Sequence, residues 1–263
     1  MSIPRPAPDA CALVTGASSG IGRELARGLA ARGHAVVLVA RRRERLEELA
    51  RELAGRHGVR AEPIACDLVD RPARTALPQR VRELGLRVDV LVNNAGFGVG
   101  GPFHESRLDY ELQMLGVLCE APLELTRAFL PSMVARRSGA VLNVASTAGM
   151  QPLPHSAGYA AAKAHLLSFS EALHAEVRRH GVSVTALCPG PVDTELFERN
   201  DHPVERLPRP LWLQADRVAA EGLHALERNR RVVIPGAIIR AGSPLMRLAP
   251  RALELRLVER IFR

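Results

Sequence analysis

The sequence has few of the features that mark metal, disulfide or membrane-spanning proteins. Its four cysteines, Cys11, Cys66, Cys119 and Cys188, lie far apart, and none is part of a CxxC pair. This spacing argues against a zinc site and a disulfide framework and favours small buried side chains. No apolar run approaches the roughly 18 to 20 residues needed to span a bilayer. The Pro-rich start, residues 1–9, lacks the layout of a secretory signal, so we expect a cytoplasmic location.

Aromatic residues are also scarce, at 3% of 263 residues. None of them interleaves with a basic stripe, which is the pattern of a protein that binds single-stranded nucleic acid. The formal net charge is +8, but residues 228–263 hold nine Arg against two Glu, so nearly all the excess lies in this tail. We therefore expect no nucleic-acid partner.

Lysine is nearly absent. Only one of the 36 basic residues, Lys163, is a lysine, and all the others are arginines. An ammonium is a compact charge whose proton can be exchanged, whereas a guanidinium is effectively always protonated. The single lysine therefore indicates a position where arginine fails.

Short apolar runs of strand length alternate with segments that have helical spacing of apolar residues. The predicted strands are 12–15, 35–40, 61–65, 88–92, 140–144, 183–187 and 231–234. The predicted helices are 21–32, 41–57, one or two within 108–134 with a break at Pro122, 159–180 and 216–228. This alternation predicts an α/β fold: a single Rossmann-like, doubly wound parallel sheet with helices on both faces.

The predicted domain layout is an extension over residues 1–10, a dinucleotide-binding catalytic domain over 11–240 and a basic tail over 241–263. Within the domain, a Pro-rich irregular stretch at about 193–213 follows the carboxyl end of a strand, where ligands bind in open α/β sheets. Its apolar residues can serve as a lid over an apolar substrate or can dock the stretch on the core. The tail is amphipathic and can contact an anionic membrane or pack on its own fold or on a second subunit.

A Gly-rich turn links the first predicted strand to the first helix. It reads Thr15-Gly16-Ala17-Ser18-Ser19-Gly20-Ile21-Gly22. Glycines let the backbone approach a pyrophosphate closely, and a helix N-terminus offers unpaired N–H groups and a positive dipole end. The strand, turn and helix together predict a phosphate cradle.

The G-x-x-x-G-x-G spacing with a leading Thr15 is similar to the cofactor loop of the short-chain dehydrogenase/reductase family. The resemblance covers roughly residues 12–236 and implies a nicotinamide cofactor, a small-molecule carbonyl or alcohol substrate, and a homodimer or homotetramer. Further motifs carry it: Asp67 and Leu68 match the adenine contact, Asn93-Asn94-Ala95-Gly96 the family's Asn-Asn-Ala-Gly motif, and Pro189-Gly190-Pro191-Val192 with Thr194 its Pro-Gly motif. The residues predicted to bind the cofactor are Gly16, Ser18, Ser19, Gly20, Ile21, Gly22, Arg41, Arg42, Asp67, Leu68, Asn93, Ala95, Gly96, Tyr159, Lys163, Pro189, Gly190, Val192 and Thr194.

The end of the second strand predicts which nicotinamide is bound. An NAD site places an acid there for the ribose 2′-hydroxyl, whereas an NADP site has arginine nearby for the 2′-phosphate. Here Ala40 holds the acidic position, and Arg41 and Arg42 follow it. Because a guanidinium suits a phosphate, we expect NADP(H).

The candidate catalytic residues are Ser146, Tyr159 and Lys163. Tyr159 and Lys163 are four residues apart, which places both on one face of a helix. A phenol near its ordinary pKa of ~10 is a poor proton donor at neutral pH, and a nearby ammonium is expected to lower that pKa. Ser146 follows a strand and can hydrogen-bond a substrate oxygen. This trio resembles the family's active site.

One position departs from the family pattern. Family members usually have an Asn in the helix before the Ser strand, and it holds a water that passes protons to the lysine. Leu118 stands at that place, and no Asn occurs from Ala95 to Leu142. Either a backbone carbonyl or a neighbour such as Cys119 or Glu120 supports another relay, or turnover is slow, or catalysis has been lost.

The sequence therefore predicts an NADP(H)-dependent oxidoreductase that reduces a ketone or aldehyde, reversibly, on an apolar small molecule, with no metal. The alternatives are a catalytically weak or inactive NADP(H)-binding sensor or scaffold, and a basic membrane- or nucleic-acid-binding protein on the same fold. Phe97, Phe103 and His155 are further candidates for the substrate pocket.

Overall fold

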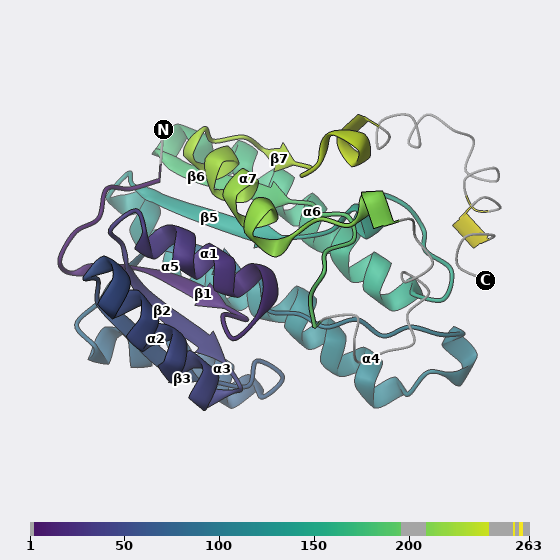
Figure 1. Cartoon of the computed structure of the whole chain (residues 1–263), viewed down its shortest axis with the longest axis horizontal. Coiled ribbons are helices and arrows are strands. Elements are labelled where there is room, and N and C mark those ends of the chain that lie inside the picture. The colour runs from purple at the N-terminus through teal and green to yellow at the C-terminus, as the bar shows by residue number, and fades with distance from the viewer. Residues whose placement is uncertain (1–2, 196–208, 242–254, 256–257, 260–263) are drawn as a thin grey trace.

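A seven-stranded parallel sheet forms the centre of the computed structural model, which describes residues 3–195, 209–241, 255 and 258–259 (Figure 1). The strand order is β3-β2-β1-β4-β5-β6-β7. The strands are β1 (Ala10–Thr15), β2 (Ala35–Ala40), β3 (Ala61–Ala65), β4 (Arg87–Asn93), β5 (Gly139–Val144), β6 (Val182–Leu187) and β7 (Val232–Val233). The chain moves outward from β1 to β3 and then returns to β4 beside β1, so the order reverses between β1 and β4.

Helices cover both faces of this sheet. The α-helices are α1 (Gly20–Ala30), α2 (Arg43–His57), α3 (Arg71–Glu83), α4 (Leu108–Leu115), α5 (Ala121–Ala135), α6 (Ala157–Val177) and α7 (Ala215–Glu227). The shorter turns are the 3-10 helices η1 (Phe103–Glu105), η3 (Thr147–Met150), η4 (Arg178–His180) and η6 (Arg209–Leu211) and the π-helical turn η2 (Gly116–Glu120).

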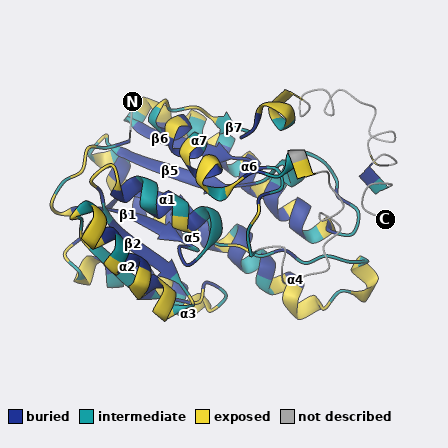
Figure 2. Ribbon diagram, viewed as in Figure 1, coloured by how far each residue is buried: buried dark blue, intermediate teal, exposed yellow. Residues whose placement is uncertain are grey.

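Alternate residues of each strand contribute to two separate cores. On β1, Ala12 and Val14 pack with α1, α2 and α7, whereas Cys11 and Leu13 pack with α3, α5 and α6. Because both faces are covered, β1, β5 and β6 are buried along their whole length and β4 is buried from Val88 onward, and Figure 2 shows these buried strands at the centre. This confirms the predicted doubly wound Rossmann-like fold.

Three local features differ from the sequence-based prediction. Helix α3 was not predicted, because Leu77 and Val81 are its only buried apolar residues and they give little helical periodicity. Helix α2 begins at Arg43, two residues later than expected, so Arg41 and Arg42 lie between the strand and the helix. The break expected at Pro122 is the π-helical turn η2, and Pro122 lies in the first turn of α5.

A buried arginine joins α3 to η2 and α5. The Arg74 side chain is 1% exposed and donates to the Leu68 carbonyl at 2.9 Å and to the Gly116 carbonyl at 3.3 Å. It also pairs with Glu120 and Glu124 at 2.8 and 2.7 Å. Gly116 is the first residue of the π-helical turn, so this guanidinium holds a turn whose backbone departs from regular α-helix.

Replacing Arg74 with Leu should lower the free energy of unfolding by about 2 kcal/mol, because it leaves two carbonyls and two carboxylates without their partner. Chemical denaturation measures the change. Arg71→Leu is the matched control: Arg71 lies on the same helix and is 77% exposed, and it contacts Glu124 only at 3.5 Å. Equal stability of the two variants would contradict the importance of the buried guanidinium.

Part of the predicted loop and most of the tail lie outside the described residues. The described end of the loop docks on the core, where Trp212 packs beside Leu153, Ala160 and the tail residue Val258. None of the helices in the described ranges is long and apolar enough to cross a membrane. Those ranges also hold no cluster of three or more side chains suited to a metal ion.

Candidate active site

A cavity of about 560 Å³ lies at the carboxyl ends of the central strands. It begins at the Gly-rich turn after β1, passes the end of β4 and ends against Ser146, Tyr159 and Lys163. The point where the strand order of an open α/β sheet reverses is where ligands bind, and here that point is between β1 and β4. The volume falls within the ~300–1,000 Å³ of small-molecule sites.

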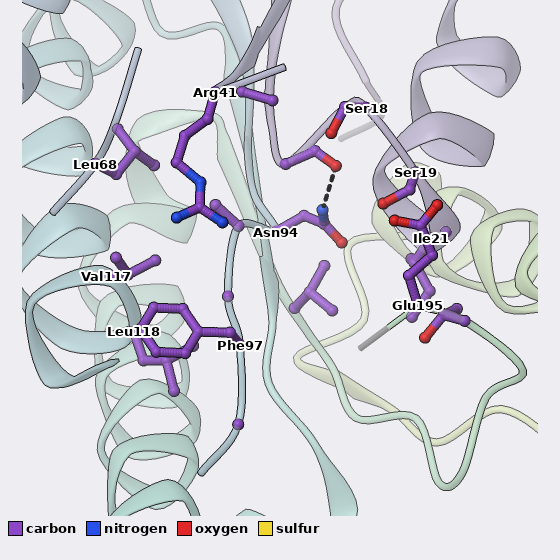
Figure 3. Close-up of a pocket in the computed structure, with 18 of the residues that line it drawn as sticks. Ser18, Ser19, Ile21, Arg41, Leu68, Asn94, Phe97, Val117, Leu118 and Glu195 are labelled. Atoms are coloured by element: carbon purple, nitrogen blue, oxygen red, sulfur yellow. Dashed lines mark hydrogen bonds between the residues drawn. The ribbon is translucent and has the colours of Figure 1, made fainter. Parts of the chain in front are cut away.

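The Gly-rich turn is packed tightly against the end of β4. Gly16 has a φ of +67°, which favours glycine, and the Asn94 amide nitrogen donates to the Thr15 and Gly16 carbonyls at 2.9 and 3.4 Å. Figure 3 shows Asn94 and one of its hydrogen bonds to the turn. A Cβ on Gly22 would lie 2.3 Å from the Gly16 carbonyl oxygen. The turn therefore requires these glycines for its own geometry. Asn94 was not among the predicted site residues, although it belongs to the Asn-Asn-Ala-Gly motif.

The N-terminus of α1 faces this cavity and suits an anion. Ser19 is the N-cap residue, and no side chain of the described residues caps the helix there. The first turn of α1 holds no acidic residue. Its leading N–H groups, together with the positive end of the helix dipole, form a binding position for a phosphate.

Two arginines from the end of β2 enter the same end of the cavity. Arg41 is exposed and points into it, between Leu68 and Asn94 (Figure 3). Arg42 donates to the Ser18 hydroxyl at 3.0 Å and to the Ser19 hydroxyl at 2.8 Å. The arginines and the serines therefore gather hydrogen-bond donors at one place.

Asp67 and Leu68 form the neighbouring wall, after β3. The Asp67 carboxylate accepts from the Val69 N–H at 3.0 Å, which fixes the turn, and the buried Leu68 lines the cavity. Both residues lie where the resemblance places the adenine. Their contact with a cofactor stays a prediction.

The candidate catalytic residues meet at the opposite end. Ser146 follows β5, caps η3 by accepting from the Ala148 N–H at 3.1 Å, and hydrogen-bonds the Tyr159 hydroxyl. Tyr159 and Lys163 lie one turn apart on α6, and both are buried. The Lys163 Nζ donates to the Val144 carbonyl at 2.8 Å and lies 5.7 Å from the centre of the Tyr159 ring.

The pKa of Tyr159 differs from the sequence-based expectation. Burial raises it to about 12, while the hydrogen bond from Ser146 acts in the opposite direction. Burial also lowers the pKa of Lys163 to about 8, because the charged amine loses its hydration. Desolvation of the phenol therefore dominates in the free protein, and the expected lowering by the lysine is not seen there.

Leu118 lies in the π-helical turn and forms an apolar wall beside the tyrosine. It is buried with Met114, Tyr159 and Ala162. A Cβ on Gly96 would lie 2.6 Å from a Leu118 methyl carbon, so this side chain packs directly on the loop after β4. The next residue, Cys119, donates its thiol to the Ala162 carbonyl at 3.9 Å. Apolar side chains therefore fill the place to which the resemblance assigns the family's Asn.

Most of the predicted site residues line the one cavity. They are Gly16, Ser18, Ser19, Gly20, Ile21, Arg41, Arg42, Asp67, Leu68, Ala95, Gly96, Ser146, Tyr159, Lys163, Pro189, Gly190, Val192 and Thr194. Gly22 lies behind the turn. Asn93 is buried beneath the cavity, where its amide donates to Asn143 at 2.8 Å and to Thr126 at 3.2 Å. This bonding joins β4 to β5 and α5, and the residue does not line the cavity.

The substrate end of the cavity contains residues that were not predicted. Phe97 lines it as expected, whereas Phe103, which is 62% exposed, and His155 do not. Tyr110, Gln113 and Val117 add a wall from α4 and η2. Their helical spacing was a usable signal, since positions three and seven apart share a helix face. Glu195 was also missed, and no local pattern indicated it.

Comparison with known proteins agrees with this geometry. The family model for short chain dehydrogenases matches residues 10–204. A short chain dehydrogenase of Pseudocercospora fijiensis is 41% identical over 193 residues, 72% of this chain and 62% of that protein. A very-long-chain 3-oxoacyl-CoA reductase of Anas platyrhynchos is 36% identical over 71% of this chain and 61% of that protein, so the matches span about three fifths of these two relatives.

A solved structure extends the likeness over nearly the whole chain. A short-chain dehydrogenase from Sphingobium yanoikuyae in complex with NADPH superposes with a TM-score of 0.81 at 32% identity, covering 92% of this chain and 97% of that one. The family match, the parallel sheet and the cavity at the strand reversal all lead to one assignment. The chain belongs to the short-chain dehydrogenase/reductase family of oxidoreductases.

Proposed function

We propose that the protein is an NADP(H)-dependent oxidoreductase that reduces a ketone or aldehyde to an alcohol, reversibly, on an apolar small molecule. One observation carries the proposal: the Ser146, Tyr159 and Lys163 side chains lie at one end of the same cavity whose other end receives Arg41 and Arg42. The NADPH complex of the Sphingobium relative supports the cofactor. The 3-oxoacyl-CoA reductase from Anas supports a carbonyl substrate.

The residues present fit a dinucleotide. The tight Gly-rich turn and the uncapped start of α1 suit a pyrophosphate, and the serine and arginine side chains suit a 2′-phosphate. Asp67 and Leu68 would flank the adenine, and Pro189 to Val192 with Thr194 would flank the nicotinamide. When bound, NADP(H) would supply or accept the hydride.

The chain's own residues would then manage the proton. The Ser146 and Tyr159 hydroxyls bond each other in the free protein, so both face one small region of the cavity. A carbonyl oxygen in that region would accept from both hydroxyls. Tyr159 would give its proton to the developing alkoxide, and the Lys163 ammonium would stabilise the tyrosinate that remains.

The lysine sets an upper pH limit for this reduction. Below about pH 8 Lys163 is charged, and above it the neutral amine no longer stabilises the tyrosinate. We therefore expect kcat for carbonyl reduction to fall as the pH rises through about 8, measured with saturating cofactor. Tyr159, with its pKa of about 12, stays protonated throughout and does not cause the fall.

Unfolding is not the cause of this fall either. Between about 8 and the ordinary lysine value of 10.5 the unfolded chain binds more protons at this group than the folded chain, so the stability contribution of Lys163 rises with pH. A thermal unfolding series at each pH is the control. A rate that stays constant up to pH 10.5 would contradict the role of the lysine.

The substrate end of the cavity favours an apolar carbonyl compound. Phe97, Val117 and Leu118 line this end with apolar side chains, and Tyr110 and Gln113 supply a few polar groups. Pockets of this kind bind by apolar contact and use their few polar groups to fix orientation. The described end of the Pro-rich loop packs on the core through Trp212 and Leu213.

The decisive test is oxidation of NADPH and NADH against a panel of aliphatic and aromatic ketones, aldehydes and diketones, with binding of both cofactors measured in parallel. Turnover with a preference for NADPH supports the proposal. Tight NADPH binding without turnover supports a cofactor-binding sensor or scaffold. The apolar wall at Leu118, which offers no side chain to hold a proton-relay water, is the observation that favours this alternative. Weak binding of both cofactors would overturn both functions.

A further inference from the structure

An acidic side chain occupies the arginine cluster at the cofactor end of the cavity. Glu195 follows the Pro-Gly motif after β6, and its two carboxylate oxygens pair with different arginines. Arg42 donates to one oxygen at 2.6 Å and Arg45 donates to the other at 2.5 Å. These two ion pairs hold the carboxylate beside the Gly-rich turn, near Ser19 and Ile21 (Figure 3).

The donors that hold Glu195 overlap with those assigned to the 2′-phosphate. The same Arg42 guanidinium donates to the Ser18 and Ser19 hydroxyls, so the carboxylate completes a set of four polar groups at this point. Carboxylates and phosphates both bind a guanidinium through parallel, charge-assisted hydrogen bonds. The two anions therefore compete for one set of donors.

Glu195 is anchored at this position by its own segment. The Asp193 N–H donates to the Leu213 carbonyl at 3.1 Å, and Val192 forms a parallel bridge with Leu213. Thr194 lies directly over the turn, since a Cβ on Gly20 would be 3.0 Å from its methyl carbon. A tethered anion acts at a high effective concentration, so the segment presents the carboxylate to the arginines efficiently.

The carboxylate of Glu195 is charged throughout the neutral pH range. The hydrogen bonds from Arg42 and Arg45 lower its pKa to about 2. Arg41, by contrast, makes no hydrogen bond or ion pair to any described residue and points into the cavity. The free protein therefore keeps one arginine available and neutralises the next one internally.

We propose that Glu195 weakens the preference for NADP(H) by competing with the 2′-phosphate of this cofactor for Arg42. NADP(H) must displace the carboxylate from Arg42, whereas NAD(H), which carries a hydroxyl at this position, binds with both ion pairs of Glu195 intact. Glu195 thus narrows the preference for NADP(H) over NAD(H). This inference rests on the proposed function, in which Arg41 and Arg42 receive the 2′-phosphate.

Glu195→Gln tests the competition, because it removes the charge and keeps the shape. Calorimetry on the cofactor-free protein measures Kd for NADPH, NADH, 2′-AMP and 5′-AMP. We expect NADPH and 2′-AMP to bind about tenfold more tightly than to the wild type, with little change for NADH and 5′-AMP. Unchanged or weaker NADPH binding would overturn the proposal and would show that the ion pairs of Glu195 only hold its own segment in place.

Two further variants make the result specific. Glu47 on α2 pairs with Arg43. Glu47→Gln removes the same charge as Glu195→Gln and should leave all four affinities unchanged. In an Arg42→Ala background, Glu195→Gln should give a smaller gain for NADPH, because the contested guanidinium is missing. A full gain in that background would overturn the proposal. Thermal unfolding of each protein without cofactor checks that the variants are folded.

The same measurements separate this inference from the proposed function. The proposed NADP(H) preference fails if the wild type binds NADPH no more tightly than NADH. The inference fails if the ratio of the two affinities is the same in the wild type and in Glu195→Gln. If the wild type binds both cofactors equally and Glu195→Gln prefers NADPH, the proposed NADP(H) preference is overturned and the competition between Glu195 and the 2′-phosphate is supported.

Discussion

Replacing Tyr159 with Phe should lower kcat by roughly 10²- to 10⁴-fold, the usual contribution of a positioned general acid, and should leave NADPH affinity nearly unchanged. The change removes a single oxygen from a buried side chain that packs against Leu118 and Met114. The ring keeps these contacts, so the cavity keeps its shape. The proton donor for the alkoxide and the hydrogen bond to Ser146 are lost together.

The chain provides a close control for this substitution. Tyr110 is its only other tyrosine, lines the same cavity from α4 and is 46% exposed. Tyr110→Phe should retain most of the chemical step at saturating ketone, because its half-exposed ring packs beside Arg107 and not beside Lys163. Single-turnover reduction of a ketone from the panel measures the chemical step in both variants. Wild-type turnover in Tyr159→Phe would refute the acid–base role.

Replacing Arg41 with Ala should weaken NADPH binding by about 10- to 100-fold and hardly change NADH binding. Hydrogen bonds to charged groups contribute about 1.5–3 kcal/mol each, which corresponds to this range. Arg41 has no hydrogen-bond partner among the described residues, so its removal breaks no internal contact that the structure describes. The whole effect should therefore fall on the ligand that carries the extra phosphate.

Arg43→Ala is the control for this prediction. Arg43 is the third arginine of the run, its side chain is 76% exposed, and it pairs with Glu47 on the surface of α2. Its loss removes the same charge from the same turn of the chain without reaching the cavity. Calorimetry with both cofactors compares the two variants. Equal losses of NADPH and NADH affinity in Arg41→Ala would refute the 2′-phosphate role.

Arg42 should behave differently from Arg41, although the two are adjacent. Removing Arg42 weakens the contact with the phosphate and at the same time releases Glu195 from one of its two ion pairs. The remaining carboxylate then faces the ligand with only Arg45 to neutralise it. The order of the two arginines along the chain does not reveal this difference, because Glu195 lies about 150 positions later.

The sequence alone determined those parts of the protein whose signals are local. Buried strands of a parallel sheet are continuous apolar runs, and these strands were predicted within a few residues. The strand, Gly-rich turn and helix follow one another directly in the chain. Tyr159 and Lys163 lie on one helix face because they are four residues apart. Each of these features depends on spacing within a short segment.

Other features were decided only by tertiary contacts. Helix α3 has little apolar periodicity of its own. The buried Arg74 and its acidic partners on α5 and η2 hold it in place. The π-helical turn places Leu118 against Gly96 and Tyr159, which come from two other parts of the chain. The direction of the Tyr159 pKa shift follows from the extent of its burial, and composition does not contain that information.

The electrostatics of the cofactor end show the same division most clearly. The run of arginines after β2 was enough to predict a position for the 2′-phosphate, because the sequence gives the type and charge of each residue. The occupation of Arg42 by Glu195 depends on the fold, which brings the segment after β6 over the turn after β1. Electrostatic interactions act through space, so a chain determines which charges it carries, and only its tertiary structure determines which of them meet.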